Sequence, residues 1–415
     1  MFSVFFRIST LLVGMGILLG GNGLLGTLLG VRAGLEKFPE TVTGGIMAAY
    51  FLAFIVGTFF CPAIIRRVGH IRAFAALAAT GSAAAIMHAL LVHPIAWGVL
   101  RVITGVCMVG LFMVMESWLN ALAPNERRGR IFAAYTALNL AAMAAGQFFI
   151  LAGDPLAFVP FALVAIFYSI AVVPVALTSV PEPAPVHVPH LHLHQLYAIS
   201  PLGIIGTLVA GLAQGAFWGM GAVFAQGIGL SHAGIAVFMG ATIIGGALLQ
   251  WPIGRFSDHH DRRVVLTVVC FAGALSAITA LYCAELSMPG LLASAFVYGG
   301  FAFSVYSLSV SHVNDHLAPP EVLQATSGLL LVYGIGATVG PAVVGILMDI
   351  LGPASLLGYL AAVLALLGLF GLYRARIGAP IPVETHAPFV PVVRTSQVAL
   401  ELDPRAESET ESASP

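Results

Sequence analysis

The segment "NALAPNE" (Asn120–Glu126) returns in the second half of the chain as "DHLAPPE" (Asp315–Glu321). Each copy is a short polar interruption in a strongly apolar sequence. The two halves share a second similarity, because "GGIMAAYFLAFIVG" (44–57) resembles "AGIAVFMGATIIGG" (233–246) and an arginine-bearing loop follows each. Together these similarities indicate an internal duplication.

The composition predicts a membrane protein. Of the 415 residues, 59% are hydrophobic and 8% are charged, and the mean hydropathy is +0.98, whereas a soluble globular protein carries roughly a quarter charged residues. Apolar runs of about 20 residues, long enough to cross the bilayer core as helices, recur along the chain. They lack the period of two that transmembrane β-strands show. The predicted class is therefore an all-α, multi-pass membrane protein.

The apolar runs predict twelve spans in two sets of six. These spans cover residues 10–31, 43–64, 73–93, 95–119, 131–151, 157–178, 201–226, 234–253, 264–284, 290–312, 322–348 and 354–373. The two sets would form six-helix bundles over residues 1–178 and 201–373. The Pro- and His-rich segment 179–200 is typical of a linker between bundles, and the acidic, Ser-rich end of the chain predicts a disordered tail over 374–415.

The distribution of lysine and arginine predicts the orientation in the membrane. If the N-terminus is cytoplasmic, fourteen of these residues fall in cytoplasmic loops and the tail, and only Arg32 and Lys37 fall outside. Positive charge in short loops resists translocation. Both termini and the linker are therefore expected in the cytoplasm.

Several functional classes have no support in the sequence. The net charge of −1 gives no sign of a nucleic-acid partner, and the phosphate-binding motif GxxxxGK[ST] is absent. Four cysteines stand apart in or beside apolar runs, which is typical of buried thiols. The closely spaced histidines of the linker, His187, His190, His192 and His194, have no cysteine near them, so a flexible linker is favoured and no metal or cofactor is expected.

Several motifs resemble the major facilitator superfamily. "GRFSDHHDRR" (254–263) is similar to the family signature between the eighth and ninth helices, with Gly254, Asp258, Arg262 and Arg263 at matching positions and Asp261 in place of glycine. The corresponding first-half loop, "PAIIRRVGHIR" (62–72), departs further. It keeps Arg67, Gly69 and Arg72 but has Arg66 where the family usually has aspartate and Pro62 where it usually has glycine.

Two further motifs extend the resemblance over about residues 10–375. "RVITG" (101–105) matches the Arg-x-x-x-Gly element of the fourth helix, and "YGIGATVGPAVVG" (333–345) looks like a motif of proton-coupled antiporters, although those antiporters usually carry it in helix five and here it lies in helix eleven. The stretches "QWPIGR", "SHVND" and "GLLLVYGIG" resemble an orphan bacterial subgroup of unknown substrate near the drug/proton antiporters.

The resemblance implies a secondary active transporter of the bacterial inner (plasma) membrane. Two pseudo-symmetric six-helix bundles would rock about a site at their interface, and one chain would suffice as a monomer. We expect a small organic solute and protons as the transported species, with the lipid bilayer as the other partner. Two alternatives are a non-transporting membrane sensor and a lipid or amphiphile translocase on the same fold. No convergent catalytic constellation suggests an enzyme.

Arg101 is the sharpest candidate for the transport site. A charge within a span is costly unless it faces protein or a water-filled cavity; the alternative is that Arg101 only holds helices together through hydrogen bonds. Other candidates are polar or aromatic residues expected to face the cavity, each of which could equally join helices. They are Asn22, Tyr50, Tyr135, Asn139, Gln147, Gln214, Trp218, Gln250, Tyr298, Tyr306 and Tyr333. Helix one carries no acid, which argues against a simple exchanger of cationic drugs.

His312 and Asp315 are three residues apart, so one helical face would bring them together. That pair would form either a pH-sensitive latch at the cytoplasmic mouth or a plain interfacial cap.

The family fold also implies a charged cytoplasmic gate. It would bring Arg66, Arg67 and Arg72 toward Asp315 and Glu321, and would bring Asp258 and Asp261, in the loop with Arg262 and Arg263, toward the arginines that start helix five. Those arginines are Arg127, Arg128 and Arg130. Glu116 is predicted to pair with Arg67 or Arg72 and to fasten helices two and four.

Overall fold

The structure is a computed structural model of the chain. It describes residues 2–124, 127–177 and 193–377 and, in the C-terminal tail, 381–382, 384, 386, 389–392 and 395–399. Every regular element within these ranges is helical. The elements are α1 (Phe2–Leu35), α2 (Glu40–Val68), α3 (His70–Leu90), α4 (Pro94–Leu122), α5 (Arg128–Phe148), the 3₁₀ helix η2 (Phe149–Ala152), α6 (Val159–Leu177), α7 (Leu193–Ile199), α8 (Pro201–Gly227), α9 (His232–Asp258), α10 (Arg262–Leu286), α11 (Met288–Asn314), α12 (Pro319–Leu351) and α13 (Ser355–Ile377).

Twelve of these helices are long and apolar enough to cross a membrane. Each predicted span matches one of them, with 73–93, 157–178 and 354–373 running at most three residues past a helix end, so the prediction of an all-α protein with twelve spans is confirmed. Most of the helices extend beyond the predicted spans. α2, for example, continues past residue 64 through Arg66 and Arg67, because hydropathy marks only the part in the hydrocarbon core while the backbone bonding of a helix continues through polar residues.

The helix starts follow local sequence rules. Ser200, Ser231 and Ser287 precede α8, α9 and α11, and each serine hydroxyl accepts a hydrogen bond from a backbone N–H of the first turn. A serine in this position satisfies a donor that has no partner within the helix. Proline at the first position of α4 and α8 has no N–H to leave unbonded.

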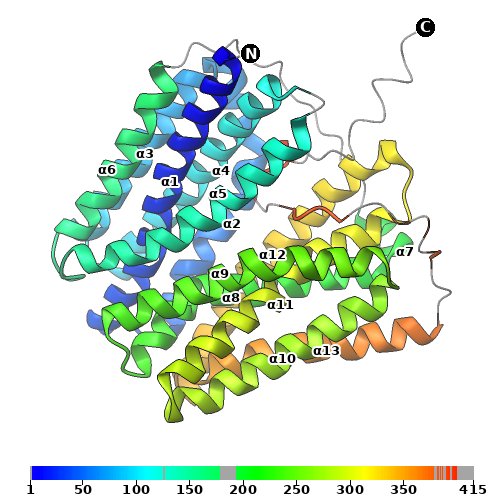
Figure 1. The fold of residues 1–415 in the computed structure, drawn as a ribbon. Helices are drawn as coiled ribbons and strands as arrows, with labels where there is room; N and C mark the ends of the chain where they lie inside the picture. The colour runs from blue at the N-terminus through cyan, green and yellow to red at the C-terminus, as the bar shows by residue number, and fades with distance from the viewer. Residues whose placement is uncertain are drawn as a thin grey trace, which may run out of the picture.

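The long helices form two bundles (Figure 1). α1–α6 pack among themselves, and so do α8–α13; the contacts between the two sets are made mainly by α2 with α12, α5 with α9 and α1 with α8, and further by α2 with α8 and η2 with α9. Residues 178–192, which include most of the predicted linker and three of its four histidines, lie outside the described residues. The last part of that linker is α7, a short helix whose Leu196 is fully buried.

Within a bundle, glycines let helix backbones touch. A Cβ atom added to Gly245 of α9 would lie 1.8 Å from the carbonyl oxygen of Phe296, and one added to Gly299 of α11 would lie 1.9 Å from that of Thr242. Small residues at such crossings are the usual device for close packing of membrane helices. The α9–α11 crossing therefore has no room for even a methyl group.

Between the bundles, close contacts gather at one end of the molecule, which we call the contact end. The backbone of α2 meets that of α12 there: a Cβ on Gly44 would lie 2.4 Å from the carbonyl oxygen of Pro341, and one on Gly345 would lie 2.5 Å from that of Glu40. The outer turns of α1 and α8 also meet there, at Gly30 and Val223. The opposite end carries the loops with Arg66, Arg127 and Arg262, and we call it the arginine end.

Asp349 joins the bundles at the contact end. Its two carboxylate oxygens accept hydrogen bonds from the backbone N–H groups of Glu40 (3.0 Å) and Thr41 (2.9 Å), the first residues of α2. An acidic side chain is unfavourable in the last turn of its own helix but favourable at the N-terminus of another. Asp349 of α12 therefore caps α2 across the bundle interface.

We expect Gly299→Ala to destabilise the protein by about 1–3 kcal/mol, because the added methyl group overpacks the α9–α11 crossing. Gly358→Ala on α13 is the matched control, since a Cβ there would meet nothing within 4 Å. Thermal unfolding of the purified variants in detergent measures the difference. Equal melting temperatures for the two variants would contradict the backbone contact.

We expect Asp349→Ala to loosen the contact end, because loss of a helix cap costs about 1 kcal/mol. The reporter for this loosening is Met47→Cys, introduced into a chain whose native cysteines are replaced by alanine. Met47 is buried at this interface. The cysteine should react about fivefold faster with a thiol reagent in the Asp349→Ala variant, since 1 kcal/mol corresponds to about that ratio. Asp349→Asn keeps a capping oxygen and should change the rate little; equal rates in the two variants would argue against the cap.

Candidate functional site

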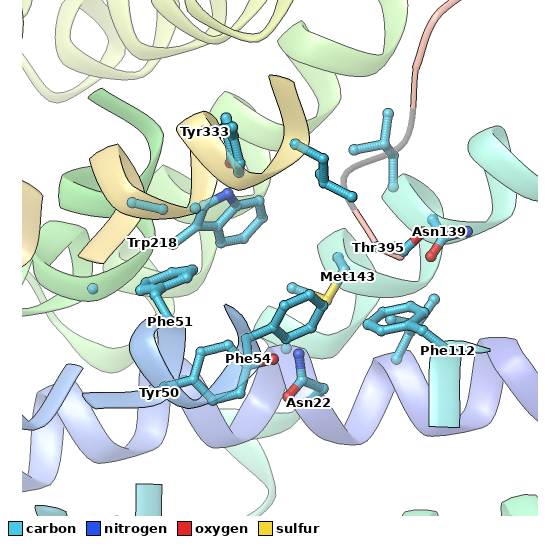
Figure 2. A pocket seen from close by; sticks show the side chains of 18 of the residues that line it. Asn22, Tyr50, Phe51, Phe54, Phe112, Asn139, Met143, Trp218, Tyr333 and Thr395 are labelled. Carbon is cyan, nitrogen blue, oxygen red and sulfur yellow. The ribbon is translucent and has the colours of Figure 1, made fainter. Parts of the chain in front are cut away.

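A cavity of about 220 Å³ lies between the bundles. Its lining includes Asn22 of α1, Tyr50 of α2, Arg101 of α4, Trp218 of α8 and Tyr333 of α12 (Figure 2). Both six-helix sets therefore contribute side chains to one chamber. Residues of α5, α9 and the C-terminal tail complete it.

Most of the predicted substrate-site residues line this cavity. They are Asn22, Tyr50, Arg101, Asn139, Gln147, Trp218, Gln250 and Tyr333. Their contribution to binding stays a prediction. The remaining candidates, Tyr135, Gln214, Tyr298, Tyr306 and His312, are buried elsewhere.

Two of these remaining candidates support a lining residue from behind. Gln214 accepts a hydrogen bond from the Tyr333 hydroxyl (3.2 Å) and donates one to the backbone oxygen of Ala302 (3.2 Å). The ring of Tyr306 meets the ring of Tyr333 edge to face, with centroids 5.0 Å apart. These contacts fix the orientation of Tyr333 at the cavity wall.

Arg101 is buried in the middle of α4 with 5% of its surface exposed. Its guanidinium carbon lies 4.1 Å from the centroid of the Tyr50 ring, and a cation over an aromatic face is stabilised by the ring's negative charge distribution. Among the described residues no carboxylate forms an ion pair with Arg101, and its Nε has no hydrogen-bond partner. The cavity therefore presents a cation whose hydrogen-bonding capacity is only partly used.

Amide and hydroxyl side chains on the first bundle both line the cavity and join its helices. Gln147 of α5 accepts a hydrogen bond from the Thr27 hydroxyl of α1 and donates to the backbone oxygen of Gly23 (3.3 Å). Asn22 of α1 accepts a bond from the Tyr168 hydroxyl of α6 (3.3 Å). The predicted alternatives, solute binding and helix joining, therefore apply to the same side chains.

Aromatic and apolar lining residues were missed by the sequence prediction. Phe51 and Phe54 of α2, Phe112 of α4 and Met143 of α5 face the cavity, and the rings of Phe54 and Phe112 lie with centroids 6.1 Å apart. In a membrane protein such residues face lipid just as readily, so composition does not reveal them. The one available signal was spacing, since Phe54 follows Tyr50 by one helical turn.

Glu116 has different partners from those predicted. The expected pairing with Arg67 or Arg72 is wrong: those arginines are exposed, whereas Glu116 is fully buried and accepts hydrogen bonds from the hydroxyls of Tyr135, Thr395 and Ser396. A buried carboxylate needs hydrogen-bond donors, and the C-terminal tail supplies all of these except Tyr135. For residues 389–392 and 395–399, the expectation of a disordered tail therefore differs from the structure.

Three acidic residues of the predicted cross-bundle gate also have partners other than the predicted ones. Asp258 lies 3.0 Å from Nη2 of Arg262, Asp315 lies 3.1 Å from Nε of Arg262, and Asp261 lies 2.7 Å from Nη2 of Arg263. All three pairs lie within the second bundle. Burial raises the pKa of Asp261, but hydrogen bonds from Arg263 outweigh this effect and hold that pKa below its ordinary value.

The remaining gate residues at the arginine end also differ from the predicted cross-bundle pairing. Glu321 accepts a hydrogen bond from the backbone N–H of Ala318 (3.2 Å) and so caps its own helix, while Arg66, Arg127 and Arg130 are exposed. His312 lies beside His316, with ring centroids 4.9 Å apart, rather than forming the predicted latch with Asp315, which pairs with Arg262. In this conformation residues 389–392 and 395–399 of the tail lie between the two bundles here.

Comparison with known proteins gives matches in sequence and structure. The family model described as Major Facilitator Superfamily matches residues 203–402. An uncharacterized MFS-type transporter from Enterobacter sp. (strain 638) is 26% identical over 387 residues, covering 91% of this chain and 97% of its own. The uncharacterized MFS-type transporter YcaD from Salmonella typhimurium (strain LT2) is 25% identical over 343 residues, covering 82% of this chain and 88% of its own.

Solved structures share the fold at low sequence identity. A crystal structure of the nucleoside transporter NupG superposes with a TM-score of 0.67 at 16% identity, covering 90% of this chain and 100% of that one. A bacterial homolog of the human lysosomal transporter Spinster, inward-facing and occupied, superposes with a TM-score of 0.71 at 13% identity, covering 91% and 97%.

Proposed function

Since the chain belongs to the major facilitator superfamily and is a multi-pass membrane transporter, we propose that it moves a small organic solute by alternating access, coupled to protons. The uncharacterized transporters that it resembles in sequence leave the solute open. The nucleoside transport named for NupG belongs to that protein, since 16% identity indicates a common fold alone. The solute class is therefore argued from the cavity itself.

The arrangement of contacts supports alternating access. The bundles touch closely at the contact end, through Gly44, Gly345 and the Asp349 cap, while the cavity between them draws its walls from both. Rocking two bundles about such a chamber exposes it to one side at a time. With the arginine end in the cytoplasm, as the loop charges favour, this conformation is closed toward the outside.

The buried Arg101 is the observation that carries the solute class. It lies in an aromatic and amide-lined chamber, over Tyr50, without a carboxylate partner among the described residues. An aromatic chamber with few charges suits an amphipathic organic molecule. A desolvated cation within it favours a solute that carries an anionic or strongly hydrogen-bond-accepting group.

Proton coupling needs a titratable group that changes its surroundings during the cycle. Glu116 is such a group, because it is fully buried between a tyrosine of the first bundle and the tail. We assign the coupling site to this carboxylate rather than to His312, which lies beside His316 and away from the chamber.

The test begins with a thermal-stabilisation screen of the purified protein against metabolites and drugs, because a ligand that binds the folded state raises the melting temperature. Uptake of the stabilising solute into proteoliposomes is then measured with and without a pH gradient. We expect Arg101→Gln to reduce uptake at least about 30-fold, since removing one partner of a buried charged contact costs about 2 kcal/mol or more. Arg101→Lys, which keeps the charge, should retain part of the activity.

Arg255→Gln is the matched control for this test. Arg255 also lies over an aromatic ring, that of Trp251 at 5.5 Å, but it is exposed. Its replacement should leave uptake unchanged. Equal activity of the Arg101→Gln and Arg255→Gln variants would contradict the assigned role, and uptake that ignores the pH gradient would remove the proton from the proposal.

A further inference from the structure

Two described stretches of the C-terminal tail, residues 389–392 and 395–399, lie between the bundles (Figure 1). We call these stretches the tail segment. The N–H of Phe389 donates to a carboxylate oxygen of Asp258 on α9 (2.8 Å), and the N–H of Val392 donates to the hydroxyl of Ser307 on α11 (3.1 Å). The Phe389 ring packs on Gly254, where an added Cβ would lie 2.0 Å from it. The first part of the segment is therefore anchored to the second bundle.

The second part of the tail segment reaches the first bundle. The hydroxyl of Thr395 donates to one carboxylate oxygen of Glu116, and the hydroxyl of Ser396 donates to the other. Val392, Thr395 and Gln397 form part of the cavity wall, and Figure 2 shows Thr395 near Asn139 at the edge of the chamber. The segment thus passes from one bundle to the other across the cavity.

Glu116 depends on these donors. It is fully buried on α4 and forms no ion pair among the described residues, so hydrogen bonds from Tyr135, from the two tail hydroxyls and from the backbone of Ala399 stabilise the carboxylate. A charge in an apolar interior is tolerated only when its lone pairs are satisfied. Whatever displaces the tail segment must therefore supply equivalent donors to both oxygens.

The position of Glu116 makes it part of the cavity wall once the tail segment leaves. Phe112 lies one turn earlier on α4, and Asn139 lies one turn after Tyr135 on α5; both of these neighbours line the cavity. Residues one turn apart share a helix face. The carboxylate and the tyrosine hydroxyl therefore continue the chamber toward the arginine end, under the tail hydroxyls.

We propose that Glu116 and Tyr135 form a subsite for a solute with two adjacent hydroxyl groups, and that the tail segment occupies this subsite as an internal substitute for that solute. This inference rests on the proposed transport function and names a chemical feature of its solute. Two neighbouring hydroxyls on one carboxylate make a pair of charge-assisted hydrogen bonds, which is the arrangement that Thr395 and Ser396 display. An amphipathic solute would place this diol at Glu116 and its other end in the aromatic chamber.

Competition between tail and solute follows from this arrangement. In the double variant Thr395→Val, Ser396→Ala, the tail segment would hold apolar groups against a buried carboxylate and would leave the site. A site that is more often vacant binds its ligand with a proportionally higher apparent affinity. The variant should therefore bind diols more tightly than the native chain.

The experiment uses the full-length purified protein in detergent and three matched probes: cis-cyclohexane-1,2-diol, cyclohexane-1,4-diol and cyclohexanol. Melting temperature is recorded against probe concentration. In the double variant the 1,2-diol should reach half-saturation at a concentration about tenfold lower than in the native chain, because the tail no longer fills the site. Its half-saturation in that variant should also be about tenfold lower than that of either other probe, because one additional hydrogen bond to a charged group contributes about that factor in affinity. Adding Glu116→Gln should remove the preference for the 1,2-diol.

A double variant on α10, Thr279→Val with Ser276→Ala, is the control, because it removes the same two hydroxyl types away from the cavity. It should bind the probes as the native chain does. Ser396→Asp, which sets a second carboxylate against Glu116, gives an independent way to expel the tail. In that variant, Thr136→Cys at the cavity wall, in a chain whose native cysteines are replaced by alanine, should react about tenfold faster with N-ethylmaleimide than in the chain with native Ser396.

Two outcomes would overturn the inference separately. Equal binding of the three probes by the double variant would refute the diol subsite. Unchanged cysteine reactivity in the Ser396→Asp variant would refute the displacement of the tail. Neither measurement requires transport, so a chain that binds the diol but fails in proteoliposomes would count against the proposed function and not against the subsite.

Discussion

One helix, α4, carries two buried charges into the interior of this protein, and the rest of the site is arranged around their desolvation. Arg101 and Glu116 are both almost fully buried, and they lie about 22 Å apart at 1.5 Å per residue, too far to pair with each other. Arg101 is stabilised by the Tyr50 ring of α2. Glu116 is stabilised by hydroxyls from α5 and from the tail. The group that stabilises Arg101 belongs to the same bundle, whereas Glu116 also needs donors from a tail segment that is attached to the other bundle.

The two ends of the interface are held by different kinds of contact, and this difference supports a rocking motion. At the contact end, glycines allow backbones of α2 and α12 to touch, and the Asp349 cap adds a directional polar contact. Such contacts are made or lost as a unit. At the arginine end, the three ion pairs described above for Arg262 and Arg263 lie within the second bundle, so movement of one bundle relative to the other leaves these three pairs intact. The contact between the bundles at that end is instead made by the tail segment, which bonds to Asp258 on one bundle and to Glu116 on the other.

The sequence predicted the membrane class, the twelve spans and much of the cavity, because each leaves a local signal. Long apolar runs mark spans, and a lone Arg101 or Gln250 in such a run is conspicuous. Phe51 and Phe112 left none, since an aromatic residue in a span suits lipid and cavity alike. The gate pairs were predicted wrongly because charge complementarity between loops does not say which conformation brings them together.

The tail shows a further limit of sequence reasoning. Its acidic, Ser-rich end suggested disorder for the whole region after the last span, yet the stretches "FVPV" (389–392) and "TSQVA" (395–399) are apolar with isolated hydroxyls. That pattern is common in many segments. Only the fold shows that Thr395 and Ser396 meet Glu116, because the need for donors arises from the burial of a residue some 280 positions earlier.

A tethered segment competes with a solute in a way that depends on conformation. A linker of this kind presents its hydroxyls at an effective concentration in the millimolar range, so weak individual contacts suffice to fill the site in the absence of solute. The segment is anchored to Asp258 and Ser307 on one bundle and to Glu116 on the other. Rocking the bundles changes the distance between these anchors, so the segment can satisfy both only near the present arrangement. By binding one arrangement better than the other it shifts the population toward that arrangement, and a solute that takes its place at Glu116 without bridging to Asp258 releases the bundles to move.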